Sequence, residues 1–348
     1  MAETLEILYA EIVIAALLPS IIYYFAAYVQ VDLIAAKDDI SAVNQDIPQL
    51  GKVLREGWYF LPPFAVLIYL LFWANQPAAV AAVWAASVLI ISGAIFSYKG
   101  RRIRLNDLYE ILAETGLVTI NLIMIVAAAG IVIGVLNMTG LGLALPTALI
   151  SIAGDNLAIL LVIAAVACIV LGMGMPTTAV YILLSALIAP AIIEAGVDDI
   201  PAHMFILYFG MMSMITPPIA LAAFAAATLT KADPMATGFV AMRFGWTAYV
   251  VPFLFVISPS LLLLGDNNQQ IAIDAGTALV GVYLISVAAI GYFRRPMSWP
   301  IRVLLILLGV AAMIPDQAVG FHGIGDILGC LLGILILAFE SVFRRKIA

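Results

Sequence analysis

The sequence predicts an all-α, polytopic integral membrane protein. Of its 348 residues 65% are hydrophobic and only 10% are charged, and the mean hydropathy is +1.16. Soluble domains average about a quarter charged residues. Apolar runs of about 20 residues, the length that crosses a bilayer as a helix, recur along the whole chain. If these runs cross the membrane one after another, all 15 Lys and Arg residues fall on the same side of it. This asymmetry fixes the orientation of the chain in the membrane.

The apolar runs give the predicted elements in order. They lie near residues 7–29, 58–75, 79–97, 115–137, 157–171, 178–195, 203–228, 247–264, 271–293, 301–315 and 323–341. Two of these segments depart from plain spans, as argued below. The expected architecture is therefore about nine transmembrane helices plus a re-entrant hairpin and a broken helix.

The loops between the runs carry charge asymmetrically. The bases are Lys37, Lys52, Arg55, Lys99, Arg101, Arg102, Arg104, Lys231, Arg243, Arg294, Arg295, Arg302, Arg344, Arg345 and Lys346. With alternating sides they all land together, and the positive-inside rule makes that side cytoplasmic. The opposite loops, 138–156, 196–202 and 265–270, carry acids alone. About eleven crossings place the N-terminus outside and the C-terminus in the cytoplasm.

The N-terminal residues, MAETLEILYAEI, carry no positive region typical of a signal peptide. An acidic N-terminus that crosses the membrane without a preceding segment is unusual. It leads us to expect that residues upstream are missing from this chain.

Two mixed stretches, 101–115 and 233–247, precede spans. Asp233 is a predicted N-cap and Pro234 a first helical residue. Both stretches are either solvated connectors or amphipathic arm helices that lie in the cytoplasmic interface and brace a moving unit.

The segment Gly172-Met173-Gly174-Met175-Pro176-Thr177-Thr178 joins two short apolar helices. Two glycines and a proline prevent regular helix there. The parity of the spans allows a re-entrant hairpin whose tip offers backbone carbonyls and two Thr hydroxyls at the midplane of the membrane. Such oxygens suit a monovalent cation such as Na⁺, and the start of the returning helix suits an anion.

The second departure is Ser213-Met214-Ile215-Thr216-Pro217-Pro218, inside the run 203–228. The two prolines remove N–H donors and free carbonyls one turn back. A lone proline in a membrane helix is usually just a kink. Two prolines one span after a Gly-Met-Pro-Thr-Thr tip favour a paired site instead.

Other residues indicate less. Cys168 and Cys330 lie in apolar runs and are expected to be small buried or lipid-facing residues. His203 and His322 have no metal-ligand spacing around them. Gly130-x-x-x-Gly134 predicts close helix packing, and Asn121 an interhelical hydrogen bond.

Glu11 and Asp326 lie near span ends, where an interfacial position is expected. There is no phosphate-binding glycine loop, no nucleophile–base set and no basic stripe with aromatics. The sequence therefore predicts that the protein is not an enzyme and that it uses no cofactor and no nucleic-acid partner. Membrane lipid is expected to surround it.

At the two departures the sequence resembles a known family. GMGMPTTAVYILLSALIAPAIIEAGV followed by AHMFILYFGMMSMITPPIALAAFAAATL is similar to the second repeat of the large membrane subunit of tripartite ATP-independent periplasmic (TRAP) transporters, most of all the fused, TAXI-associated type. The resemblance is strong over 110–264 and fair over 5–60. Beyond 271 it is unspecific and looks like the extra C-terminal helices of that type.

The resemblance implies that the chain is the second half of an inverted-repeat elevator transporter. It also implies that this transporter is a Na⁺-coupled, binding-protein-dependent secondary transporter of small organic anions. Carboxylates are the expected substrates. The resemblance implies that the substrate and ion site includes Gly172, Met173, Gly174, Met175, Pro176, Thr177, Thr178, Ser213, Met214, Thr216, Pro217 and Pro218. The Na⁺ candidates among them are Gly174, Thr177, Thr178, Ser213 and Thr216. Na⁺ is the coupling ion rather than a cofactor.

Three domains follow: inter-repeat helices with a cytoplasmic linker and arm at 1–114, the second transport repeat at 115–264 and extra C-terminal helices at 265–348. The hairpin spans about 157–195 and the broken helix about 203–228. The expected partners are a periplasmic substrate-binding protein, the missing first repeat and the small membrane-subunit region. The expected location is the bacterial or archaeal inner membrane.

Two alternatives stay open. The chain is a transporter component, or it is a truncated, non-transporting remnant or accessory membrane subunit. An intramembrane enzyme is disfavoured, since no acid–base or metal cluster is evident. The DNA upstream would discriminate between the first two, because an in-frame or neighbouring first repeat favours transport.

Overall fold

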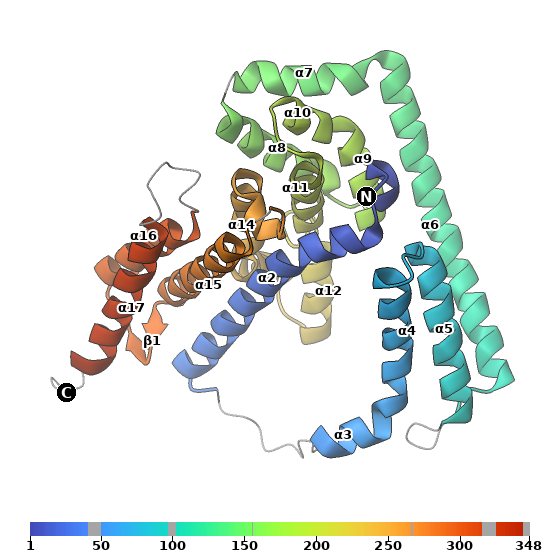
Figure 1. Ribbon diagram of the computed structural model, residues 1–348, viewed down its shortest axis with the longest axis horizontal. Helices are drawn as coiled ribbons and strands as arrows, with labels where there is room; N and C mark the ends of the chain where they lie inside the picture. Colours follow the sequence, from blue (N-terminus) through green and yellow to red (C-terminus); the bar gives the residue numbers. More distant parts are fainter. Residues whose placement is uncertain (41–49, 97–101, 155, 266, 315–324, 344–348) are drawn as a thin grey trace. The chain divides into compact units, whose positions relative to one another are not determined.

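The computed structural model describes residues 1–40, 50–96, 102–154, 156–265, 267–314 and 325–343. Apart from one pair of two-residue strands, the regular structure in these ranges is helical, as the composition predicts (Figure 1). The chain forms two compact units. One comprises residues 1–13 and 42–128, and the other comprises 14–41 and 129–348. The helices α2 (Tyr9–Lys37) and α6 (Leu105–Thr139) each contribute to both.

The first unit is built around a helical hairpin. Its elements are α1 (Ala2–Leu5), α3 (Leu50–Gly57), the 3-10 turn η1 (Trp58–Phe60), α4 (Leu61–Phe72) and α5 (Ala78–Ile95). The helices α4 and α5 pack against each other (Figure 1). Pro77 ends the turn between them at the N-cap of α5. Trp58, Tyr59 and Phe96 form an aromatic cluster at the other end of the pair.

The second unit holds the segments that the sequence singles out. Its elements are α7 (Leu141–Ala153), α8 (Leu157–Gly172), α9 (Thr177–Leu187), α10 (Ala189–Glu194), α11 (Asp199–Met212), α12 (Leu221–Thr230), α13 (Pro234–Phe244), α14 (Trp246–Ile257) and the 3-10 turn η2 (Pro259–Leu262). The helix α11 packs against α8, α9 and α14, and its side chains are almost all buried. It is the central helix of this group.

The rest of the second unit is a three-helix group. It consists of α15 (Asn268–Ile290), the antiparallel strands β1 (Tyr292–Phe293) and β2 (Arg295–Pro296), α16 (Trp299–Met313) and α17 (Gly325–Phe343). A Cβ built on Gly281 would lie 2.6 Å from the carbonyl oxygen of Gly309, so α15 and α16 approach closely, backbone to backbone. Val29 and Leu33 of α2 pack into the same core as Leu284, Val287 and Leu305.

Four helical segments within the described ranges are long and apolar enough to cross a membrane: Tyr9–Lys37, Ala78–Ile95, Pro234–Ile257 and Asn268–Ile290. Shorter apolar helices include Leu157–Gly172, Thr177–Leu187, Leu221–Thr230 and Trp299–Met313. Short helices at the predicted hairpin and break are what interruption of a long apolar run by Gly and Pro produces.

Several local expectations are wrong. The stretch 138–156, expected as a loop, contains the 13-residue helix α7. The stretch around 105–115 is no separate arm helix, because α6 runs for 35 residues without a break. No described atom lies within 4 Å of a Cβ built on Gly130 or Gly134, so the motif makes no close packing with the described residues. Asp326 is only 2% exposed within the fold, and its expected position at the membrane interface stays a prediction.

Other expectations concern the cysteines and histidines. Cys168 and Cys330 are both buried, as expected. His322 lies outside the described residues, and so do Lys99, Arg101 and the three C-terminal bases. The described part of the chain contains no group of three or more His, Cys, Asp or Glu that could hold a metal ion.

Candidate functional site: a hairpin tip against a helix break

The first part of the candidate site is the turn between α8 and α9. The helix α8 ends at Gly172, and Pro176 is the N-cap of α9. Gly174 has a φ of +79°, a left-handed conformation that side-chain-bearing residues rarely adopt. The amide of Met175 donates to the carbonyl of Gly172 at 3.4 Å, which closes the turn. The sequence therefore forms two short helices joined by a tight tip.

The second part is the interruption between α11 and α12. Residues 213–220 are not helical, as Pro217 and Pro218 predict, and the peptide bond between these two prolines is cis. The amide of Ala222 reaches back to the carbonyl of Met214 at 3.0 Å. Thr216 Oγ1 donates to the carbonyl of Met212 at 2.6 Å and so covers one of the carbonyls at the end of α11.

The tip and the break touch each other. Ser213 Oγ lies 2.9 Å from the carbonyl oxygen of Gly172 and 2.6 Å from that of Gly210, and Ser213 is 1% exposed. Its single proton is shared between the two acceptors. A Cβ on Gly172 would lie 2.9 Å from Ser213 Oγ and 3.0 Å from the Gly210 carbonyl oxygen. Only glycine at position 172 permits this approach.

A second polar contact fixes the break from the other side. The hydroxyl groups of Thr216 and Tyr249 lie 2.7 Å apart, and Tyr249 is on α14. Because Thr216 donates its proton to Met212, the Tyr249 hydroxyl is the donor in this pair. Thr216 is 9% exposed, so both bonds are largely shielded from water.

The helix α13 packs on Pro217 of the break. A Cβ on Gly238 would lie 2.9 Å from Pro217 Cγ, and one on Gly245 would lie 2.7 Å from Ile215 Cδ1. Asp233 caps α13 by accepting from the amide of Ala236 at 2.7 Å, as the sequence predicts. The helix α13 and the break thus form one packed assembly.

The remaining predicted residues form the open edge of this assembly. Gly174, Pro176, Thr177 and Thr178 are exposed at the tip, and Pro218 is exposed at the break. Among the described residues, no hydrogen bond reaches the carbonyls of Met173, Gly174 or Met175, or those of Ser213, Ile215 or Thr216. The start of α9 has no side-chain cap, so its first amide groups also lack a side-chain acceptor. The edge offers oxygens for a cation and a positive helix end for an anion.

Comparison with known proteins follows the same residues. The sequence-family model named "Tripartite ATP-independent periplasmic transporter, DctM component" matches residues 1–268 of this chain. These residues include both the tip and the break. The chain belongs to the DctM family. It is therefore a multi-pass membrane protein of a transporter family.

A curated relative supports this assignment. The chain is 27% identical over 187 residues to the C4-dicarboxylate TRAP transporter large permease protein DctM of Pseudomonas aeruginosa. The match covers 54% of this chain and 42% of that relative, so the matched part spans about two fifths of the relative's length. No solved structure matches this chain.

Several residues that build the site in this DctM-family chain escape sequence reasoning. Tyr249 lies in an ordinary apolar run and Gly238 in the mixed stretch 233–247, and nothing in their spacing indicates that they contact the break. His203 was noted only as lacking ligand spacing. In the structure it is 5% exposed, and its Nδ1 lies 2.8 Å from the hydroxyl of Tyr181 on α9. This pair ties α9 to α11 away from the tip.

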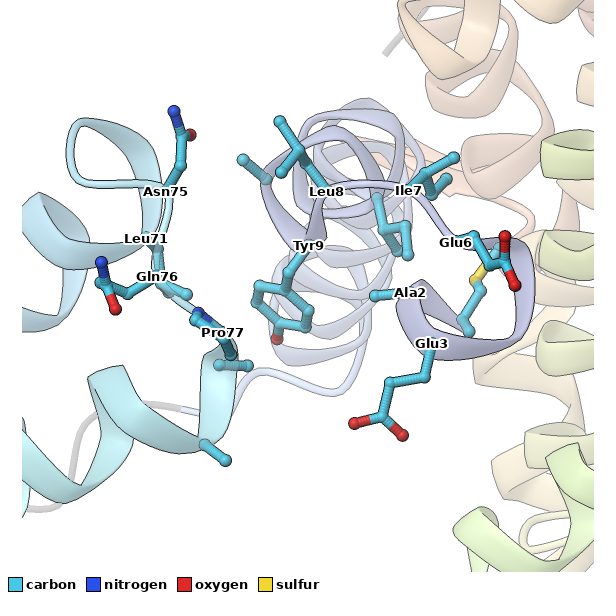
Figure 2. A pocket seen from close by; sticks show the side chains of 15 residues that line it. Ala2, Glu3, Glu6, Ile7, Leu8, Tyr9, Leu71, Asn75, Gln76 and Pro77 are labelled. Atoms are coloured by element: carbon cyan, nitrogen blue, oxygen red, sulfur yellow. The ribbon is translucent and has the colours of Figure 1, made fainter.

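The first unit contains a cavity of about 460 Å³ that involves none of the predicted site residues. It lies between the segment 1–12 and the turn from α4 to α5, with Tyr9 and Leu8 near Leu71 and Pro77 (Figure 2). Its lining is mainly apolar. Glu3 and Glu6 lie on one side and Asn75 and Gln76 on the other, with no basic side chain to receive an organic anion.

Proposed function

We propose that this DctM-family chain is the permease component of a Na⁺-coupled, binding-protein-dependent secondary transporter for small organic anions. The observation that carries the proposal is the contact between Ser213 and Gly172, which joins the hairpin tip to the broken helix. In secondary transporters, breaks of this kind hold the coupling ion with unwound carbonyls and the anion with half-helix N-termini.

The ligands follow from the open edge. Na⁺ would be held by oxygens of Gly174, Thr177, Thr178, Ser213 and Thr216, and the substrate anion by the N-terminal amides of α9. Thr177 and Thr178 are exposed, so their hydroxyl groups face whatever completes the site. Thr216 keeps one lone pair, since it donates to Met212 and accepts from Tyr249.

The partners follow from the openness of the site. The described residues contain one tip and one break, whereas a repeat-built transporter uses two of each. We infer that the complete transporter also contains a first repeat, a small-subunit region and a periplasmic substrate-binding protein. In the fused TAXI-associated type that we propose, this chain corresponds to the C-terminal portion, with its N-terminus outside and its C-terminus cytoplasmic. The substrate class is small carboxylates, in keeping with the name of the Pseudomonas aeruginosa relative.

The test is uptake by a complex that contains this chain, a first repeat and the binding protein, reconstituted in liposomes. Uptake of a radiolabelled C4-dicarboxylate should need Na⁺ and the binding protein but no ATP. Thr177→Val and Thr216→Val should each raise the Na⁺ concentration for half-maximal uptake. Thr228→Val is the matched control, since Thr228 is an exposed residue of α12 that bonds only its own helix.

Three results would count against the proposal. Unchanged Na⁺ dependence in both Thr177→Val and Thr216→Val would remove these hydroxyls from the ion site. Uptake that persists with choline in place of Na⁺ would remove Na⁺ coupling altogether. An absence of uptake in the complete complex would favour a non-transporting accessory subunit.

A further inference from the structure

A buried carboxylate outside the hairpin–break assembly has no role so far. Asp274 lies in the second turn of α15 and is 1% exposed. Gln270 Nε2 donates to its Oδ1 at 2.7 Å, and Ser260 Oγ donates to its Oδ2. Ser258 Oγ in turn lies 2.8 Å from Ser260 Oγ. Gln270 and Asp274 lie beyond residue 268, where the match to the DctM family ends.

The surroundings of this cluster leave the negative charge uncompensated. No Lys, Arg or His side chain within the described ranges makes an ion pair or hydrogen bond with Asp274. Lys37, Arg243 and Arg302 instead bond carbonyls of residues 288–290, about 20 Å further along α15 by helix rise. Two neutral donors alone do not offset a buried carboxylate, because an unpaired ion costs several kcal/mol to bury.

The cluster opens onto a cavity. A hollow of about 380 Å³ is lined by Ser258, Ser260 and Gln270, together with Leu264, Gly265, Asn267 and Asp198. Since Ser260 gives its proton to Asp274, Ser258 is the donor of the next bond, and both hydroxyl oxygens keep lone pairs. Gln270 uses its amide nitrogen on Asp274, so its amide oxygen is left as a ligand. The cavity thus has a set of hard oxygen atoms with the buried Asp274 carboxylate directly behind them, while the exposed Asp198 carboxylate lies elsewhere in the lining.

A second acid lies at the same level of the helix group. Cys330 Sγ on α17 lies 3.9 Å from the carbonyl oxygen of Thr277 on α15. Asp326 precedes Cys330 by about one turn of α17, and Asp274 precedes Thr277 by about one turn of α15, so the two acids lie at a similar level. Asp326 is also buried. This end of the group is therefore negative, whereas the bases gather at the other end.

We propose that Asp274, with the oxygens of Ser258, Ser260 and Gln270, binds a monovalent cation of the Na⁺ type from the side of the membrane opposite the basic loops. One monovalent ion neutralises the one buried carboxylate, whereas a divalent ion would leave a net positive charge beside the apolar helices. Asp198, the other carboxylate of the cavity lining, is exposed to water, which screens its charge. This ion site is separate from the one at the tip and the break. It fixes the loop 258–267, which joins the hairpin–break assembly to α15.

The test is local amide hydrogen exchange in the purified full chain in nanodiscs, with NaCl compared with choline chloride at equal ionic strength. Na⁺ at about ten times its Kd should slow exchange in segment 258–271 about tenfold, because binding holds the closed state by mass action. Asp274→Asn should abolish this slowing, and Ser260→Ala should weaken it. Asp198→Asn is the matched control, because Asp198 lines the same cavity but has no bond to Asp274.

The outcomes separate this site from the one in the proposed function. Any Na⁺ response of segments 172–178 and 213–220 should persist in Asp274→Asn, so either site can fail without the other. The proposal is overturned if Na⁺ leaves segment 258–271 unchanged, if Asp274→Asn responds like the unaltered chain, or if Asp198→Asn loses the response equally. Slowing by acid in place of Na⁺ that exceeds the intrinsic pH dependence of amide exchange, and that is lost in Asp274→Asn, would show that Asp274 holds a proton and would also overturn it. If Asp274→Asn does not fold, Ser260→Ala with an undiminished Na⁺ response overturns it as well.

Discussion

Ser213 Oγ lies 2.9 Å from the carbonyl oxygen of Gly172, so a residue of the helix break holds the last residue of the helix before the hairpin tip. The two residues are 41 positions apart in sequence and come from different helices. Because Ser213 also bonds Gly210 in its own helix, a shift of the tip would be felt at the break. The proposed ion ligands on either side of this bond are therefore positioned together.

Replacing Gly172 tests how closely the two segments approach. In Gly172→Ala the new Cβ would meet Ser213 Oγ at 2.9 Å and the Gly210 carbonyl oxygen at 3.0 Å. Overpacking of this kind costs about 1–3 kcal/mol, so the midpoint of thermal unfolding should fall. Gly276→Ala on α15 is the control, because its Cβ would meet no atom within 4 Å. An equal response of the two variants would contradict the close approach.

Thr216 and Tyr249 offer a second test of the break. Thr216→Val leaves the Tyr249 hydroxyl without its 2.7 Å acceptor and the Met212 carbonyl without a donated proton. Lost hydrogen bonds at shielded sites cost about 1 kcal/mol each, so the variant should be less stable by about 1–2 kcal/mol. Thr216→Ser keeps the hydroxyl and should be near neutral. The measurement is chemical unfolding in detergent, followed by intrinsic fluorescence. A serine variant as unstable as the valine variant would mean that packing of the methyl group, and not the hydroxyl, matters at this position.

The topology of the hairpin is open to cysteine labelling. With Cys168 and Cys330 replaced by alanine, a single cysteine at Met175 should react with small hydrophilic reagents added from the external side. A re-entrant tip brings residue 175 into the membrane from that side and back again. The control is a cysteine at Arg294, on the basic side, which should react only from the cytoplasm. Labelling of position 175 from the cytoplasm alone would mean two ordinary spans instead of a hairpin.

Sequence reasoning found the features that depend on local chemistry. Pro217 and Pro218 remove donors wherever they stand, Gly174 and Pro176 interrupt a helix, and Asp233 caps one, so the break, the tip and the cap of α13 are all visible in the sequence. It missed what depends on tertiary packing. Nothing local indicates that Tyr249 reaches Thr216, that Gly172 must lack a side chain, or that Asp326 is buried. The helix α7 was missed because its 13 residues are too short to be read as a span.

Two arginines from the basic side of the chain bond the C-terminal end of α15. Arg302 donates from Nε to the carbonyl of Ala288 at 2.7 Å and from Nη2 to that of Ala289 at 3.0 Å. Arg243 of α13 donates to the same Ala289 carbonyl at 2.8 Å. Cations at a helix C-terminus satisfy carbonyls that the helix leaves unpaired and oppose its dipole.

These bonds predict that Arg302→Ala lowers stability more than an ordinary surface change. Hydrogen bonds from charged groups are each worth about 1.5–3 kcal/mol, but the Arg302 pair is only partly buried, so we expect the lower end of that range, about 1.5 kcal/mol. Arg302→Lys keeps the charge but lacks the planar fork that reaches two carbonyls. Its stability should therefore lie between that of the unaltered chain and that of Arg302→Ala. Amide exchange in segment 287–297 should speed up in the same order. The control is Arg104→Ala, since the backbone amide of Arg104, and not its guanidinium, bonds Asp107. If Arg302→Ala and Arg104→Ala are equally stable and segment 287–297 exchanges as before, the arginine does not hold the end of α15.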